Sequence, residues 1–197
     1  MISAIVLAAG EGTRFGDTKQ LELLGGTPLV QHAIDSAAEG GVGEIVVVLG
    51  HEAARVQRAL ELPEEARVVT NERYADGQST SLATGLRVLG ASSEAVIVLL
   101  ADQPGIEARH VRALLDAFDD ARGEPDILRL RFRDAPGPAL LARSVWGEAA
   151  SLSGDAGARV LFETDPERVG WVAVDEDAPP DVDRPDDLER QRGMGNG

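Results

Sequence analysis

The sequence has 197 residues, of which 43% are hydrophobic and 27% charged, and its formal net charge is −15. This length and composition predict one domain with a sizeable core, which we place at residues 1–192, followed by a flexible tail at 193–197. The absence of cysteine excludes disulfides, thiolate catalysis and cysteine metal sites. The acidic balance disfavours nucleic acid and acidic membranes as partners, because both require a basic surface. With no stretch of roughly 18 apolar residues and no basic leader at the N-terminus, we expect a cytoplasmic protein.

The first predicted strand, Ile2–Leu7, runs directly into a loop with glycines at positions 10, 12 and 16. Glycine lets a backbone approach a ligand closely, and successive loop amides form an anion-binding concavity. Arg14 and Lys19 add positive charge to this loop. Because ligands of α/β sheets bind at the carboxyl ends of the strands, the stretch predicts a phosphate site. The alternative is a glycine-rich turn that binds no ligand.

Two common phosphate-binding motifs do not fit this loop. A Walker A loop has four residues between its glycines and then Lys-Ser/Thr, whereas five residues separate Gly10 from Gly16 and Asp17 follows. A dinucleotide fingerprint needs a glycine three residues after Gly12, and Phe15 occupies that position. The loop instead reads Leu-Ala-Ala-Gly-x-Gly-x-Arg-Phe-Gly, with a lysine three residues later.

The next elements alternate between helix and strand. Thr27-Pro28 predicts a helix N-terminus, with threonine as the cap, and Gly40-Gly41 predicts its end. The continuous apolar run Glu44–Leu49 is typical of a strand in a parallel sheet. A short helix over residues 52–60 and a strand at Arg67–Thr70 follow.

A polar stretch, residues 71–89, combines Asn71 and Gly77 with three hydroxyl residues, Ser79, Thr80 and Ser81. Any of these hydroxyls can cap the helix that follows, and for a single serine this is the simpler interpretation. A helix N-terminus rich in hydroxyls is also suited to an anion or the polar edge of a base.

The most apolar run, Ala95–Leu100, predicts a central strand, and Asp102 follows it. A carboxylate at this end of a central strand lies on the same edge as the glycine loop. It can hold Mg²⁺ against phosphates there. The alternative is a capping or turn aspartate.

The second half of the chain predicts a helix over residues 107–121, a strand at Asp126–Arg133 and a return strand at Ala139–Ala142. Three arginines at positions 129, 131 and 133 share one face of the first of these strands. They can meet an anionic acceptor, or they mark a solvated edge strand that resists pairing.

The last part predicts helices at Val145–Leu152 and from Ser153 to about residue 163, and a strand at Gly170–Val174. Asp155 can cap the second of these helices. Pro185 and the acids after it predict the start of the final helix.

Four separated motifs resemble those of the molybdenum cofactor nucleotidyltransferases, in order and over nearly the whole chain. They are the glycine loop, the Asn…Gly-x-Ser-x-Ser-Leu segment, Leu-Ser-Gly-Asp-x-Gly-Ala-Arg, and the closing Asp-x-Asp-x-Pro-x-Asp-Leu. The resemblance, with the strand–helix alternation, implies a three-layer α/β/α sandwich with a mainly parallel, Rossmann-like sheet of the nucleotide-diphospho-sugar transferase type.

The resemblance also implies roles for individual residues. Those that would bind the nucleotide are Leu7, Ala8, Ala9, Gly10, Gly12, Arg14 and Lys19 at the phosphates, and Asn71, Gly77, Ser79 and Ser81 at the base. Arg14, Lys19 and Asp102 would be catalytic. Asp102 would hold Mg²⁺, with Asp183 as a second ligand or a support, unless Asp183 only caps the last helix. Gly154 and Asp155 would lie on the acceptor side.

The activity implied is transfer of CMP from CTP to the phosphate of molybdopterin, with release of pyrophosphate and possible service to a molybdoenzyme. The Ala8-Ala9 loop favours the cytidylyl over the guanylyl branch, but GTP stays open. Relatives often carry Gly-His-Pro where this chain has Gly137-Pro138, which leaves the acceptor open as well. The alternatives are guanylyl transfer, another small phosphorylated acceptor such as phospholactate, or a non-catalytic cofactor carrier.

Overall fold

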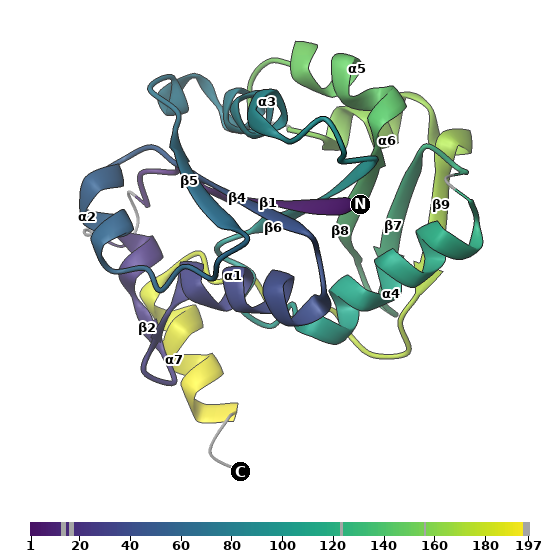
Figure 1. The fold of residues 1–197 in the computed structure, drawn as a ribbon. Helices are drawn as coiled ribbons and strands as arrows, with labels where there is room; N and C mark the ends of the chain where they lie inside the picture. Colours follow the sequence, from purple (N-terminus) through teal and green to yellow (C-terminus); the bar gives the residue numbers. More distant parts are fainter. Residues whose placement is uncertain (13–14, 16–17, 123, 156, 195–197) are drawn as a thin grey trace.

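A seven-stranded sheet runs through the middle of the molecule, in the order β5-β4-β1-β6-β8-β7-β9 (Figure 1). This computed structural model describes residues 1–12, 15, 18–122, 124–155 and 157–194. The strands are β1 (Ile2–Ala8), β4 (Glu44–Leu49), β5 (Ala66–Thr70), β6 (Ala95–Leu100), β7 (Ile127–Arg131), β8 (Pro136–Ala142) and β9 (Val169–Ala173). Only β8 runs antiparallel to its two neighbours in this sheet, so the sheet is mainly parallel, as predicted.

Helices cover both faces of the sheet and complete the predicted sandwich (Figure 1). One face carries α1 (Leu29–Gly40) and α4 (Ala108–Asp120), and the other carries α3 (Gln78–Val88), α5 (Trp146–Ser151) and α6 (Arg159–Thr164). The remaining helices are α2 (Ala53–Arg58) and α7 (Pro185–Met194), with short 3-10 turns η1 (Lys19–Leu21), η2 (Tyr74–Asp76), η3 (Arg143–Val145) and η4 (Pro166–Arg168). Among the described residues, no helix is both long and apolar enough to cross a bilayer.

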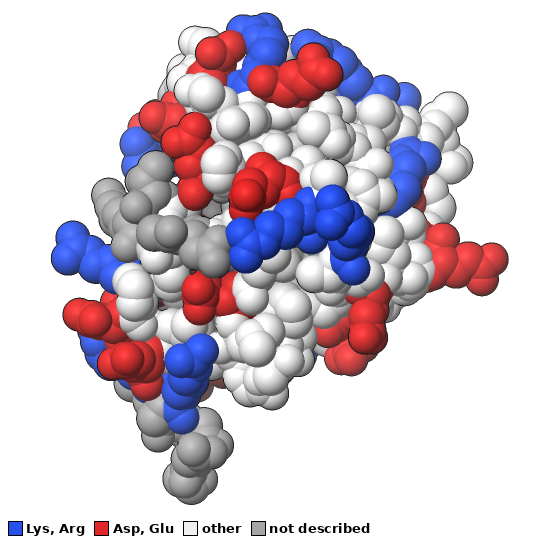
Figure 2. Space-filling view, turned by 90° about the vertical axis from the view of Figure 1, so that its left-hand side faces the viewer, with Lys and Arg blue, Asp and Glu red and all other residues white. Residues whose placement is uncertain are grey.

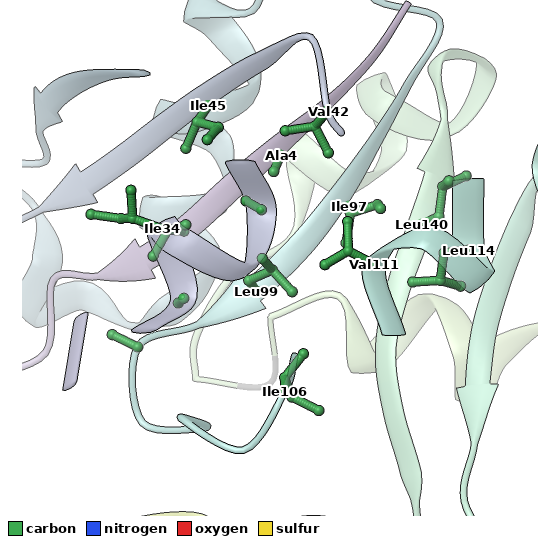
Figure 3. Close-up of a cluster of buried hydrophobic side chains, with 14 of the residues drawn as sticks. Ala4, Ile34, Val42, Ile45, Ile97, Leu99, Ile106, Val111, Leu114 and Leu140 are labelled. Atoms are coloured by element: carbon green, nitrogen blue, oxygen red, sulfur yellow. The ribbon is translucent and has the colours of Figure 1, made fainter. Parts of the chain in front are cut away.

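The core is split between the two faces of the sheet. Along β1, Ala4 and Val6 belong to the cluster under α1 and α4, whereas Ile5 and Leu7 belong to the cluster under α3 and α5. Figure 3 shows the first cluster, where side chains from two helices meet those of the central strands. Burial on both faces explains why the central strands are continuous apolar runs rather than alternating ones.

The start of the first helix differs from the prediction. Thr27 and Pro28 form strand β3, which pairs with β2 (Leu23–Leu24), and α1 begins one residue later without a side-chain cap. The cause is the Gly25–Gly26 turn between them, in which both glycines have positive φ, the geometry of a two-residue hairpin. The end of α1 is as predicted, with Gly41 in the left-handed region.

Strand β7 is not an edge strand, so that interpretation of its arginines is wrong. It lies between β8 and β9, and β9 comes from a segment about forty residues later in the sequence. Arg131 stacks on Trp171 of β9 at 5.6 Å, and Arg133 pairs with Asp177 at 3.0 Å. The edge strand on this side of the sheet is β9. The local sequence pattern could not show that it pairs with β7.

Three helix ends also differ from the sequence patterns. Helix α3 takes Gly77 as its N-cap, so Ser79, Thr80 and Ser81 lie inside its first turn. Ala158 is the N-cap of α6, which excludes Asp155 from that role. Helix α7 begins at Pro185, as predicted, and extends to Met194, two residues beyond the expected domain limit.

Candidate functional site

A cleft of about 510 Å³ opens at the carboxyl ends of β1 and β6, and we call it the first cleft. Its lining comes from four segments of the chain: Leu7, Ala8, Ala9, Gly10, Glu11, Gly12, Lys19, Gln20, Tyr74, Ala75, Gly77, Gln78, Ser81, Leu100, Ala101, Asp102 and Asp155. Figure 2 views the side of the molecule toward which β1 runs, and its described part shows acidic and basic groups interspersed without a broad basic patch.

The glycine loop is held at its base by a buried glutamine. The Gln20 side chain donates hydrogen bonds through Nε2 to the carbonyls of Ala8 (3.1 Å) and Gly10 (2.6 Å). These bonds hold the start of the loop against η1, so that the backbone of residues 7–12 forms one wall of the first cleft. Residues 13, 14, 16 and 17 lie outside the described part of the chain, and the predicted phosphate ligand Arg14 is among them.

Lys19 lies between two aspartates that are far from it in sequence. Its Nζ is 3.0 Å from Oδ2 of Asp102 and 3.3 Å from Oδ1 of Asp183. The lysine side chain is 14% exposed, so this ammonium is mostly withdrawn from water. The Val182 amide donates a hydrogen bond to the carbonyl of Asp102 at 2.8 Å. This bond holds the segment that contains Asp183 beside the end of β6. Lys19 is also the only lysine in the sequence.

This arrangement fits a divalent cation. The two carboxylates already converge on one positive charge, and Oδ1 of Asp102 is buried without a hydrogen-bond partner among the described residues. A buried oxygen that lacks a partner is costly, and a metal ion would satisfy it. Among the described residues, no group of three or more acidic or histidine side chains is arranged to hold a metal ion by itself. Two carboxylates completed by phosphate oxygens and water are typical of Mg²⁺ sites.

Of the four residues predicted to bind the nucleotide base, two line the first cleft and two do not. Gly77 and Ser81 line the first cleft. Asn71 does not: it is buried, and its Nδ2 donates to Oγ of Ser81 (3.0 Å) and Oγ1 of Thr80 (2.8 Å), so it acts by holding the start of α3. Ser79 is fully buried, and its Oγ has no partner among the described residues.

Two distant loops meet at Gly77. A Cβ at this position would lie 2.5 Å from the carbonyl carbon of Gly154 and 2.9 Å from the amide of Asp155, and its φ of +111° also requires glycine. The amide of Ser79 donates to the carbonyl of Gly154 at 3.2 Å. This contact brings Asp155 to the rim of the first cleft, whereas Gly154 supports the rim without lining it.

A second cleft of about 590 Å³ adjoins the first and shares Leu7, Gln78, Leu100 and Asp155 with it. Its other lining residues are mostly apolar: Leu82, Val98, Gln103, Arg129, Pro136, Gly137, Pro138, Ala139, Ala158, Arg159, Phe162 and Asp181. Gly137 and Pro138, which the structure places in β8, are part of this second cleft.

Sequence reasoning missed several residues of the two clefts, notably Gln20, Gln78 and Asp181. Gln20 directly follows Lys19, but only the fold shows that its amide turns back to the loop. Asp181 accepts a hydrogen bond from Gln103 Nε2 at 2.9 Å. Although part of the residue is exposed, desolvation of its carboxyl raises the pKa of Asp181, and the nearby charges of Asp102 and Asp183 raise it further.

Two curated relatives are similar to most of this chain. A protein named nicotine blue oxidoreductase, from Paenarthrobacter nicotinovorans, is 30% identical over 200 residues, covering 96% of this chain and 95% of that protein. The bifunctional protein GlmU of Chromohalobacter salexigens is 31% identical over 153 residues, covering 77% of this chain. The chain aligns with only 32% of GlmU, so it corresponds to about a third of that protein.

Solved structures agree with the architecture. The crystal structure of Rv0371c from Mycobacterium tuberculosis superposes with a TM-score of 0.86 at 31% identity, covering 98% of this chain and 97% of that one. A second structure of that protein, described as a complex with manganese, has a TM-score of 0.81 at 29% identity and covers the same shares of both chains. The family model of the MobA-like NTP transferase domain matches residues 4–169. The chain therefore belongs to the MobA-like NTP transferase family, the group of nucleotidyltransferases that includes the molybdenum cofactor enzymes.

Proposed function

We propose that this protein transfers a nucleoside monophosphate, CMP from CTP, to the phosphate of a molybdopterin-type acceptor. The observation that carries the proposal is the convergence of Lys19, Asp102 and Asp183 beside the glycine loop. In the reaction, an acceptor phosphate oxygen attacks the α-phosphorus of the triphosphate. The bond from this phosphorus to the bridging oxygen breaks, and pyrophosphate leaves with that electron pair.

The residues of the first cleft would act by position and charge, because phosphoryl transfer needs no protein nucleophile. Backbone amides of residues 8–12 would bind the phosphates. Lys19 would leave its carboxylate partners and neutralise the departing pyrophosphate, with Arg14 assisting. Gly77 and Ser81 would accommodate the base at the start of α3.

Asp102 and Asp183 would hold a divalent cation, Mg²⁺ in the proposed enzyme. When bound, such an ion neutralises phosphate charge and orients the reacting oxygens. Its own charge would also offset the protein's net charge of −15, which otherwise repels a triphosphate. The resemblance of the two carboxylates to family ligands and the unpartnered oxygen of Asp102 support this role.

The choice of CTP and of the pterin acceptor has less support than the reaction class. CTP is favoured by the Ala8-Ala9 pair and the Arg14-Phe15-Gly16 run of the first loop, and GTP is the second candidate. The acceptor would lie in the second cleft, against Asp155. Since one relative is named an oxidoreductase, the proposal has to be tested by the reaction product and not by binding alone.

The deciding experiment is a pyrophosphate-release assay with Mg²⁺, a molybdopterin acceptor, and CTP, GTP or ATP in turn. We expect release only when nucleotide and acceptor are both present, and fastest release with CTP. Faster release with GTP would reassign the base. Nucleotide binding without release under any condition would contradict the enzyme and favour a cofactor carrier.

The single lysine offers an independent binding assay. Reductive methylation with ¹³C-formaldehyde modifies only Lys19 and the amino terminus, and it keeps the positive charge. We expect Mg²⁺ with CTP to shift the NMR signal of the Lys19 methyl groups while leaving that of the terminus unchanged. An unshifted Lys19 signal at saturating nucleotide would exclude this lysine from the phosphate site.

A further inference from the structure

Arg129 differs from the other arginines of its strand. It lies on β7 and is half-buried in the lining of the second cleft, whereas Arg131 and Arg133 are exposed and lie outside that lining. Arg131 stacks on Trp171, and Arg133 pairs with Asp177. Of the three arginines, only Arg129 lines the second cleft.

The guanidinium of Arg129 is oriented but not neutralised. Its Nε donates to the carbonyl of Gly137 at 3.0 Å, and its plane lies over the ring of Phe162 at 4.6 Å. No carboxylate forms an ion pair with it among the described residues. The nearby Glu163 instead pairs with Arg159 at 3.3 Å. Desolvation lowers the pKa of Arg129, although the guanidinium stays charged at neutral pH.

The register of the sheet places Arg129 at the far end of the second cleft. Arg129 lies opposite Ala139 of β8, and Ala139 lies opposite Val98 of β6. Beyond β6 comes β1, whose Leu7 lines both clefts. Three strand spacings of about 4.8 Å separate β1 from β7, so the floor extends roughly 14 Å from the first cleft to Arg129.

The floor between these ends is apolar. Leu7, Val98, Leu100 and Ala139 line it from the sheet, and Leu82 and Phe162 line it from the helices. Such a surface is suited to a flat ring and offers few hydrogen bonds. A half-buried guanidinium at the end of an apolar floor, with a hydrogen bond only at Nε among the described residues, is therefore available for the polar end of a ligand.

We propose that Arg129 is a specificity-determining residue for the acceptor, and that it binds two coplanar hydrogen-bond acceptor atoms at the end opposite the attacking phosphate. The guanidinium is a planar fork whose donors match a carboxylate, or a ring carbonyl next to a ring nitrogen. The acceptor is thus an extended molecule with a phosphate at one end, a flat middle and a paired acceptor edge at the other. This inference rests on the proposed function, because it places the acceptor in the second cleft.

Two matched pairs of probes test the inference by fluorescence titration in the presence of Mg²⁺ and CTP. Pterin has a ring carbonyl beside a ring nitrogen, whereas 2,4-diaminopteridine replaces this carbonyl with a donor. Likewise, 2-naphthoate offers a carboxylate, whereas 2-naphthamide does not. We expect Arg129→Gln to weaken binding of pterin or of 2-naphthoate by roughly tenfold to a hundredfold. The affinity for the matched analogue, 2,4-diaminopteridine or 2-naphthamide, should stay unchanged. The affected pair identifies which edge the cleft takes.

Arg131→Gln is the matched control, since it removes an arginine from the same strand outside the second cleft, and it should bind all four probes like the unmodified protein. Arg129→Lys keeps the charge but not the fork, and we expect an intermediate loss. Unchanged affinity of Arg129→Gln for both pterin and 2-naphthoate would overturn the inference.

Turnover separates this inference from the proposed function. In Arg129→Gln, the KM for the acceptor should rise at least tenfold, whereas the KM for CTP and the Lys19 methyl shift on nucleotide binding should stay unchanged. If nucleotide did not shift the Lys19 methyl signal of the protein without the Arg129 substitution, the proposed function itself would be refuted. A retained nucleotide response with an unchanged acceptor KM in Arg129→Gln would refute only the role of Arg129.

Discussion

The two clefts lie side by side on one sheet but are built differently. The first is formed by backbone of the glycine loop, the start of α3 and one cluster of charged side chains at strand ends. The second is formed by side chains from the face of the sheet and from α3 and α6. A site made from backbone suits a ligand part that never varies, such as a triphosphate, and a site made from side chains can change with the acceptor.

The clefts also differ in the polar groups that they leave without partners. In the first, Oδ1 of Asp102 and Oε1 of Gln20 are buried with no hydrogen-bond partner among the described residues. Each unsatisfied atom costs about 1–3 kcal/mol, which a ligand or metal ion can recover on binding. The second cleft contains two desolvated ionisable groups, the carboxyl of Asp181 and the guanidinium of Arg129, and Arg129 is the cation without a carboxylate partner among the described residues. We therefore expect metal and phosphate in the first cleft and an electron-rich edge in the second.

Asp102→Asn should have the largest effect, and the effect should fall on the first cleft. We expect turnover to fall by about 10²-fold or more, because one preorganised charge at the phosphates is lost, while the backbone bond from Val182 to Asp102 remains. Pyrophosphate release measures the effect, and thermal unfolding checks the fold. Asp177→Asn, which alters an exposed ion pair outside both clefts, should keep full activity. Near-normal turnover of the Asp102 variant would refute its catalytic role.

Lys19→Met should have opposite effects on two properties of the first cleft: it should slow turnover of the triphosphate, and it should not weaken binding of the metal ion. A charge-assisted hydrogen bond contributes about 1.5–3 kcal/mol, so turnover should fall roughly tenfold to a hundredfold. Without nucleotide, however, Mn²⁺ should bind at least as tightly, since the ammonium no longer competes for Asp102 and Asp183. Electron paramagnetic resonance of free Mn²⁺ gives the affinity. Weaker Mn²⁺ binding would mean that Lys19 orders the carboxylates and does not compete for them.

Gly77→Ala tests the loop contact that positions Asp155, a residue that lines both clefts. The new Cβ would meet Gly154 at 2.5 Å in a backbone conformation reserved for glycine, and we expect a loss of about 2 kcal/mol, or about 4–8 °C in melting temperature. Gly147→Ala is the matched control, because a Cβ there meets nothing within 4 Å. Equal melting temperatures for the two variants would show that the loops do not depend on this contact.

The smallest effect is expected outside both clefts, where ion pairs serve only the fold. Hydrogen bonds from Arg109, and then from His110, lower the pKa of Glu176. Because the folded state binds this proton less readily, the pair stabilises the fold above the ordinary carboxyl pKa, and the contribution is lost as pH falls through the lowered value. Glu176→Gln should therefore lower the urea midpoint slightly at pH 7, and its difference from the unmodified protein should shrink as the pH falls below the ordinary carboxyl pKa. A constant difference across this range would contradict the linkage.

Local sequence was sufficient for much of the fold. Strands β4 and β6 occupy the predicted residues, because continuous apolar runs bounded by turns have few other solutions in an α/β domain. Where local signals competed, the prediction was wrong: the Gly25–Gly26 turn produced a hairpin in which Thr27 and Pro28 pair as a strand. The inferred roles of Arg14, Lys19 and the aspartates stay predictions until activity is measured.

Short runs of adjacent residues were sufficient to predict the motifs, most helices and strands along the chain, and the family. The pairing of β9 with β7, the ion pairs of Lys19 with Asp102 and Asp183, and the place of Arg129 in the second cleft could be seen only in the folded molecule. These features join residues separated by tens of positions. Their pairing depends on sheet register and on which face each side chain occupies, and no local pattern carries that information.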